Sequence, residues 1–225
     1  MRRSISVKKT MTIEKGEDWG HRALFPDDAP IVDGDAELAA LFSVTTDDEN
    51  NQTLTGPSVV GLKKAIDSSK SHDLATTVSA RGSETDLRTG ERTHLPIDLG
   101  VVSLDGALHV MAASLVIRTP LWTRVVQGAM NASFLGDWNV TPSGHPNDGR
   151  FDIVRAELTL GDRFKARSRL ASGSHVPHPD ISIRRLRSHD FEPVAGAQVR
   201  IDGQNLGAAD DVSVTVIADA TTIVI

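Results

Sequence analysis

Residues 142–154 read PSGHPNDGRFDIV, a tight turn that leads directly into a strand-like segment. Asp148 can accept a hydrogen bond from the backbone just after it, and Gly149 tolerates the positive φ that such turns need. Phe151 and Ile153 then alternate with polar residues, which is the pattern of a half-buried strand. The stretch therefore predicts a strand that begins at a turn with a carboxylate at its tip. That carboxylate either caps its own turn or holds a ligand.

Short strands and turns continue on both sides of this segment. Asp105-Gly106 predicts a hairpin within 97–118, and the small residues of 123–136 predict a close approach of backbone or ligand. Further strands are expected at 151–158, 181–187, 197–201, 212–217 and 221–225. The one helix expected among them covers 163–170, with Asp162 as its N-cap. Many short strands between Gly, Pro and Asp turns predict a β-sandwich.

The first ninety residues have a mixed pattern. Residues 31–42 predict a short strand followed by a helix whose N-cap is Asp33 or Asp35. Residues 57–69 have apolar side chains at near-helical spacing and predict a second helix. The turn-rich segment that follows contains one expected strand, at 74–78.

The predicted fold class is mainly β: a β-sandwich with a small α/β remnant at the N-terminus. We expect a disordered arm over residues 1–20, a truncated α/β remnant over 21–92 and a sandwich domain over 93–225. This arm is basic and has no apolar stretch behind it, so it is not a secretory signal. The alternative to a disordered arm is an over-long gene start, with Met11 instead of Met1 as the true initiator.

Composition limits the function classes. The net charge is −6, which argues against a general nucleic-acid binder. Cysteine is absent, which excludes disulfides, thiolate catalysis and zinc–cysteine sites. No run of 18 apolar residues and no secretory signal occur. We therefore expect a cytoplasmic protein with no nucleic-acid partner and at most peripheral membrane contact.

Three segments, taken in order, resemble motifs of the diacylglycerol- and sphingosine-type lipid kinases of the NAD kinase superfamily. PSGHPNDGRFDIV resembles that family's Pro-x-Ala-x-x-x-Asp-Gly-hydrophobic turn, SGSHV (172–176) its Gly-x-His loop, and IDGQN (201–205) its Asp-Gly-Glu motif. The resemblance covers about residues 95–225. It implies the C-terminal sandwich half of such a kinase, in a stand-alone actinobacterial form.

The resemblance implies a magnesium site. In the family the Asp of the first motif binds Mg²⁺ with two backbone carbonyls, which here would be Asp148 with the carbonyls of His145 and Arg150. One carboxylate, carbonyls and waters suit this hard cation. The alternative is that Asp148 only caps its turn.

The resemblance also implies that catalysis is impaired. Gln204 stands where the family has its general-base Glu, and an amide cannot take up the proton of the attacking hydroxyl. Asp202 would be a positioning residue. The family's Gly-Gly-Asp-Gly-Thr phosphate loop has no counterpart, and only Gly82-Ser83 loosely matches a later Gly-Thr-Gly-Asn-Asp segment. ATP binding is therefore not expected of this chain alone.

Three functional hypotheses remain. The first is a lipid-kinase-like protein that binds a lipid or other hydroxyl-bearing amphiphile and is weak or inactive unless a separate nucleotide-binding chain assists it. The alternative is a non-catalytic interaction or scaffold module, and the third is a complete lipid kinase with a degenerate phosphate loop around Gly82. An apolar tunnel lined by strands from 108–117, 123–135 and 151–158 favours the first, whereas a filled interior favours the scaffold.

Two further groups of residues have a functional and a plain interpretation. The basic residues of 163–187 either form a solvated face or favour anionic headgroups and phosphate. His175, His178 and Asp180 are transition-metal ligand types, but a Pro-rich extended loop does not bring the two imidazoles together, so a surface loop with exposed histidines is favoured.

Overall fold

The computed structural model describes residues 19–47, 51–63, 69–120, 122–123 and 125–225. The expected arm over 1–20 thus lies almost entirely outside the described residues, as does part of the helix expected at 57–69. The chain is mainly β, as predicted, with two large sheets and four short helices among the described residues. None of these helices is both long and apolar enough to cross a membrane.

The first large sheet has seven strands and is built around two long ones. The long strands are β6 (Glu91–Leu104) and β17 (Val212–Val224). The others are β1 (His21–Leu24), β2 (Ile31–Val32), β5 (Val59–Leu62), β7 (Ala107–Met111) and β14 (Ser188–Phe191). The order is β1-β6-β17-β5-β2, with β7 added beside β6 and β14 beside β17.

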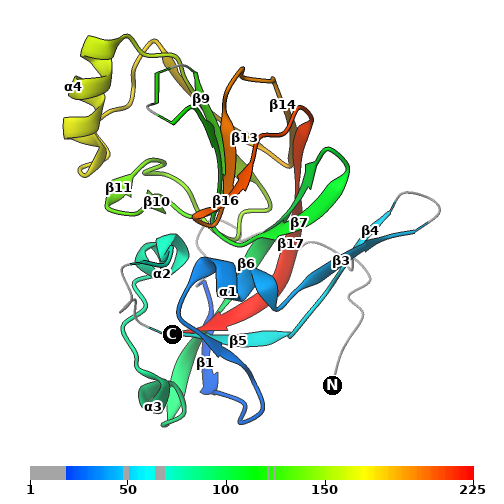
Figure 1. Cartoon of the computed structure of the whole chain (residues 1–225). Coiled ribbons are helices and arrows are strands. Elements are labelled where there is room, and N and C mark those ends of the chain that lie inside the picture. Colours follow the sequence, from blue (N-terminus) through cyan, green and yellow to red (C-terminus); the bar gives the residue numbers. More distant parts are fainter. Residues whose placement is uncertain (1–18, 48–50, 64–68, 121, 124) are drawn as a thin grey trace.

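The second large sheet has six antiparallel strands in the order β13-β12-β9-β8-β15-β16. These are β8 (Ser114–Arg118), β9 (Val126–Met130), β12 (Phe151–Ala156), β13 (Ile181–Leu186), β15 (Gln198–Ile201) and β16 (Gln204–Gly207). One core joins its inner face to β6, β7, β14 and β17, with Phe151, Leu115 and Met111 fully buried. The two sheets therefore form the predicted sandwich (Figure 1).

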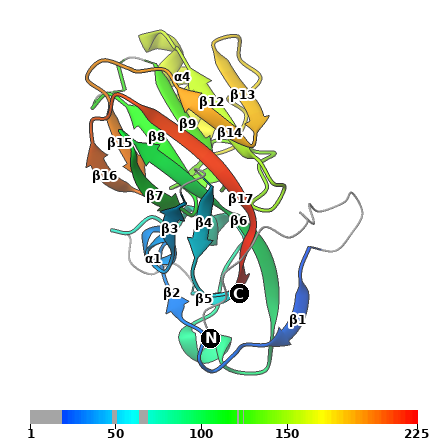
Figure 2. The same cartoon turned by 90° about the vertical axis from the view of Figure 1, so that its right-hand side faces the viewer.

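The other end of the molecule is an α/β arrangement with its own core. Strand β5 pairs in parallel with the last residues of β17, and β2 pairs in parallel with β5. Three helices, α1 (Asp35–Ala40), α2 (Asp73–Thr77) and α3 (Glu84–Leu87), and the hairpin of β3 (Ser43–Thr46) and β4 (Gln52–Thr55) complete it. Figure 2 shows β17 running from the sandwich into this group, so the expected boundary at 92/93 falls inside β6 and the chain's last residues return to the α/β end.

Two Asp-Gly turns have the backbone geometry that is typical of this residue pair. Asp105 and Gly106 have φ of 49° and 85° and join β6 to β7, which confirms the predicted hairpin. Asp202 and Gly203 have φ of 49° and 81° and join β15 to β16 in the same way. Positive φ at both central residues is typical of the type I′ turn that fits twisted strands.

Several predictions of secondary structure and of helix caps are wrong. Residues 59–62 form the buried strand β5, because β-branched Val59 and Val60 pair in parallel with β17. The strand expected at 74–78 is helix α2. Helix α1 is capped by Gly34 rather than by Asp33 or Asp35. The last helix, α4 (Leu160–Leu170), begins earlier than expected, because Thr159 caps it by accepting from Asp162 N.

Candidate functional site

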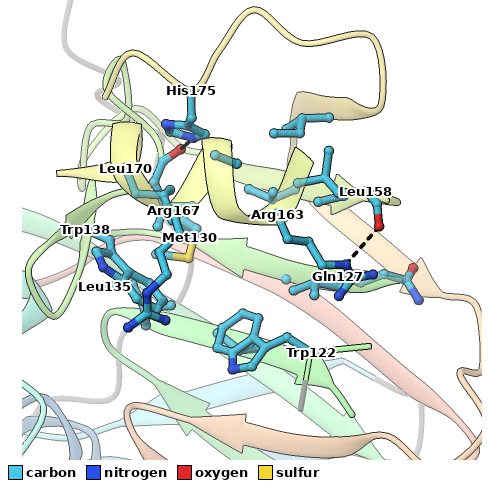
Figure 3. A pocket seen from close by; sticks show the side chains of 18 of the residues that line it. Trp122, Gln127, Met130, Leu135, Trp138, Leu158, Arg163, Arg167, Leu170 and His175 are labelled. Atoms are coloured by element: carbon cyan, nitrogen blue, oxygen red, sulfur yellow. Dashed lines mark hydrogen bonds between the residues drawn. The ribbon is translucent and has the colours of Figure 1, made fainter. Parts of the chain in front are cut away.

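A pocket of about 310 Å³ lies on the outer face of the six-stranded sheet. Its floor is formed by β8, β9 and β12, and α4 covers it from one side. The hairpin of β10 (Phe134–Leu135) and β11 (Trp138–Asn139) closes another side through Leu135 and Trp138. Figure 3 shows α4 crossing above the floor strands, with His175 and Trp122 at opposite ends. Such a volume is at the lower end of the range of ligand pockets.

The pocket exists because the floor strands are apolar on both faces. In β8, Leu115 and Ile117 point into the sandwich core, whereas Val116 between them lines the pocket. In β12, Ile153 belongs to the core and Val154 to the pocket. Successive strand residues face opposite sides of a sheet, so an apolar residue at each position requires a cover on both sides.

Gly128 explains the small residues of β9. A Cβ added at this position would lie 2.5 Å from the carbonyl oxygen of Leu115, so a side chain cannot be accommodated against the backbone of β8. Gly128 also lines the pocket floor. The expected close approach of backbone or ligand is thus seen for the backbone.

Tryptophan and arginine side chains form the rim. The Arg118 guanidinium lies 4.4 Å from the ring centre of Trp122, and that of Arg167 lies 5.1 Å from Trp138. The two indoles meet edge to face at 5.9 Å. Arg163 Nε donates to Leu158 O at 2.8 Å. The rim therefore combines aromatic surface with positive charge, whereas the floor is apolar.

His175 adds one buried polar group to the lining. It is 5% exposed, so the exposed loop histidine favoured from sequence is wrong for this residue. Nε2 lies 3.1 Å from Val140 O, and because a carbonyl only accepts, Nε2 carries the proton. Nδ1 is then an acceptor, and it has no hydrogen-bond partner among the described residues. Burial lowers the pKa of His175, which keeps the ring neutral.

A second feature, three buried carboxylates, lies where the α/β end meets the sandwich. Asp35 of α1 accepts from Asp73 N at 2.6 Å, from Leu74 N at 3.2 Å and from Ser71 Oγ at 2.9 Å, and so caps α2 from outside. This remote cap explains why 73–77 is helical despite its β-branched residues. Burial, together with the charges of Asp202 and Asp73, raises the pKa of Asp35 to about 8.

The predicted catalytic residue Asp202 belongs to this group. Its carboxylate accepts from the amides of Ala112, Ala113 and Ser114 at 2.8–2.9 Å, which holds the turn between β7 and β8. Burial raises the pKa of Asp202 to about 6. Gln204, the other predicted catalytic residue, is exposed at the start of β16.

Asp73 connects the carboxylates to the pocket wall. Its Oδ1 accepts from Gly136 N at 2.7 Å, within the turn between the pocket-lining strands β10 and β11. Its Oδ2 accepts from Ser114 Oγ at 3.3 Å. Burial raises the pKa of Asp73. The carboxylate group and the pocket thus share one structural element, the β10–β11 hairpin.

The opening motif forms a separate polar network. Asp98, fully buried in β6, accepts from Gly149 N at 2.7 Å and Asp219 N at 2.9 Å. Burial raises the pKa of Asp98 to about 6. Asn131 links this network to the carboxylate group, because its Nδ2 donates to both Asp98 O and Ala112 O at 2.8 Å.

The predicted magnesium ligand Asp148 is bound within the protein. Its Oδ1 accepts from Arg150 N at 3.0 Å, the turn-capping bond, and Oδ2 lies 3.7 Å from Arg185 Nη1. The same guanidinium contacts Asp152 at 3.2 Å and donates to Ser143 O. The ring of His145 packs against Trp19. Asp148 therefore caps its turn, as the alternative interpretation expected, and a Mg²⁺ site at Asp148 with the carbonyls of His145 and Arg150 stays a prediction.

The remaining predicted residues lie elsewhere. Ser83 caps α3 through Asp86 N at 3.2 Å, and Gly82 packs against the same short helix.

His178 and Asp180 lie beside Asp162. Among the described His, Asp and Glu side chains, these three form the only group of three whose possible metal-ligand atoms all lie within 4.8 Å of one another. Asp162 already accepts from Thr159 and Lys165, and His178 Nδ1 from Asp180 N.

Sequence analysis named Asp35 only as a candidate helix cap and assigned no functional role to Asp73 or Asp98. A signal existed for the first, since Gly34-Asp35 follows a strand, begins a helix and matches two residues of the Gly-Gly-Asp-Gly-Thr pattern. Asp73 likewise begins α2, in the connection that follows β5. Asp98 lies inside a long strand, where nothing in the local pattern indicates that it accepts bonds from two loops.

No protein-family model matches the chain, and no curated protein is similar in sequence. Three solved structures from Bacillus anthracis str. Sterne are similar in fold, two described as a putative diacylglycerol kinase and one as a diacylglycerol kinase. Each aligns over 75% of this chain and over 69%, 67% and 69% of its own, with identities of 12%, 11% and 12% and TM-scores of 0.47, 0.47 and 0.50. At this identity the likeness concerns the fold alone, which is diacylglycerol-kinase-like.

The extent of the likeness is larger than the sequence motifs indicated. Residues 95–225 make up less than three fifths of the chain, so an alignment over 75% includes part of the α/β end.

Proposed function

We propose that this diacylglycerol-kinase-like protein binds a hydroxyl-bearing lipid or similar amphiphile, with its apolar chain in the pocket beneath α4. The pocket itself carries the proposal. A scaffold module has no need for an apolar cavity of about 310 Å³ between a sheet and its covering helix. An apolar pocket with a polar rim is typical of a ligand site.

The chemistry of the lining supports an amphiphile. Apolar side chains of the floor suit an acyl or alkyl chain, and each buried methylene contributes about 0.8 kcal/mol. His175 Nδ1 is buried and has no donor among the described residues, so the hydroxyl group of the ligand is proposed from the resemblance to lipid kinases and not from this ring. The cationic rim of Arg163 and Arg167 suits an anionic or strongly polar head.

The local charges argue against ATP binding by this chain alone. The connection between β2 and α1 and the first turn of α1 carry the negative charges of Asp33 and Glu37. Lys70 Nζ lies 2.5 Å from both Asp33 and Glu37 and so neutralises only part of this charge. Asp35 N is already bound to Ser71 O at 3.0 Å. Phosphate groups are bound by free backbone N–H groups and positive charge, and this acidic segment offers neither at Asp35 N.

Phosphoryl transfer is accordingly expected to be weak or absent. The Gln204 amide cannot act as a base, and the Asp202 carboxylate is occupied by three backbone amides. We predict that the purified chain releases no ADP from ATP and Mg²⁺ in the presence of diacylglycerol, and that Gln204→Glu does not restore turnover. A coupled ADP assay checks this, and robust turnover by the wild-type chain would show it to be wrong.

Lipid binding itself is tested by filling the pocket. Ala156→Phe places a ring at the pocket lining and removes room for about two methylenes, so we expect about tenfold weaker binding of a short-chain diacylglycerol. The fluorescence of Trp122 and Trp138, both at the pocket, reports the titration. Leu24→Phe is the matched control, because Leu24 is an exposed apolar residue of β1.

The outcome separates the hypotheses. Weakened binding by Ala156→Phe with wild-type binding by Leu24→Phe supports the pocket as the lipid site. Equal affinities for all three proteins, or no titration at all, would remove the lipid proposal and leave the scaffold module.

A further inference from the structure

Helix α4 presents two large apolar side chains to solvent. Phe164 is 75% exposed and Leu160 is 68% exposed. They are four residues apart, so they lie on one side of the helix, one turn from each other. Both also line the pocket, so this exposed side is the part of α4 that borders the pocket.

The same helix is strongly basic. It carries four cationic side chains, Arg163, Lys165, Arg167 and Arg169, and one carboxylate, Asp162. Lys165 Nζ lies 3.1 Å from that carboxylate and so compensates it. The chain as a whole has a net charge of −6, so α4 differs in sign from the rest of the protein.

We propose that α4 docks on the surface of an anionic lipid bilayer, with Leu160 and Phe164 inserted between headgroups and the basic side chains in contact with them. A helix with an apolar side, cationic flanks and low overall hydrophobicity is the kind that lies in the membrane interface. The inference rests on the proposed function, because docking would bring the pocket opening to the surface from which a lipid enters.

The charges favour a bilayer over a second copy of the chain. A symmetric dimer formed through this surface would place the basic helix of one protomer against that of its partner, and like charges repel. The rim of Trp122 and Trp138, each paired with an arginine, also suits a headgroup layer, where amphipathic rings and guanidinium groups are stabilised.

Flotation of the full chain with vesicles tests the docking. We expect binding to vesicles of phosphatidylcholine mixed with phosphatidylglycerol, weaker binding to phosphatidylcholine alone, and release at raised salt. The double substitution Leu160→Ser/Phe164→Ser should weaken partitioning by about tenfold or more. Leu24→Ser, at an equally exposed apolar residue on β1, should have no effect.

A second variant separates this inference from the proposed function. Lys165 and Arg169 do not line the pocket, so Lys165→Gln/Arg169→Gln should weaken vesicle binding by about tenfold while leaving the fluorescence titration with soluble short-chain diacylglycerol unchanged. Vesicle binding that neither double substitution reduces would overturn the docking, even if the pocket binds lipid. So would dimerisation in solution that Leu160→Ser/Phe164→Ser abolishes, if vesicles are not bound.

Discussion

Asp202→Ala is expected to destabilise the protein by about 3–5 kcal/mol. The carboxylate is almost fully buried, and its loss leaves the amides of Ala112, Ala113 and Ser114 without their acceptor. Each unsatisfied buried donor costs about 1–3 kcal/mol, of which relaxation and entering water recover a part. Urea unfolding, followed by circular dichroism, measures the change.

Asp105→Ala is the matched control for this substitution. Asp105 has the same φ of 49° in the same kind of Asp-Gly turn, and its side chain also accepts from backbone amides, but it is exposed. We expect a loss of only about 1 kcal/mol, since water replaces the lost bonds. Similar losses for the two substitutions would mean that backbone strain, and not the buried acceptor, determines the stability of the β15–β16 turn.

The stability of the protein is also expected to fall as the pH rises from 7 to 9. The pKa of Asp35 is about 8 in the folded chain and about 4 in the unfolded chain, so the folded state holds a proton that the unfolded state has lost. The free energy of unfolding therefore decreases with pH and levels off above the folded pKa, by about 1.4 kcal/mol in this window.

The other groups whose shifted pKa values are known to be about 6, and the buried histidines, do not titrate in this window. Asp98 and Asp202, with pKa values of about 6, have already ionised, and the lowered pKa values of His94, His145 and His175 act only at lower pH. The chain has neither Cys nor Tyr to titrate. Urea unfolding at several pH values should show the decrease in the wild type and none in Asp35→Asn. A decrease that persists in Asp35→Asn would assign the proton to another group.

The sandwich was predictable because its signals are local. Asp105-Gly106, Asn147-Asp148-Gly149 and the alternation after Phe151 each fix a turn or a strand within a few residues. The core faces of these strands follow from the same alternation. A local sequence pattern does not indicate which strand pairs with which. For this reason β6 and β17 were not predicted as long paired strands that run through both ends of the molecule.

The α/β end was harder because its structure depends on distant residues. Residues 59–62 have a helix-like apolar spacing, yet pairing with the last residues of the chain makes them a strand. Residues 73–77 become a helix because Asp35, nearly forty residues earlier, accepts from the first amides of that helix. Neither interaction can be predicted from the residues near 59–62 or 73–77 alone.

The same limit applies to the candidate site. The motifs singled out Asp202 and the opening turn, but Asn131, which joins their two networks, comes from another segment. So does Asp73, which binds the β10–β11 turn at Gly136. The pocket had a weak local signal, the apolar residues on both faces of β8 and β12. The basic residues of 163–169 were noted, but their position over the pocket depends on how α4 packs on the sheet.

Mass spectrometry of the lipids that copurify with the protein decides whether the pocket beneath α4 holds a hydroxyl-bearing lipid. We expect the wild-type chain and Leu24→Phe to carry lipids with a free hydroxyl group, and Ala156→Phe to carry far less. Wild-type protein without lipid, or Ala156→Phe with the same lipids in the same amount, would show that the pocket is not a lipid site.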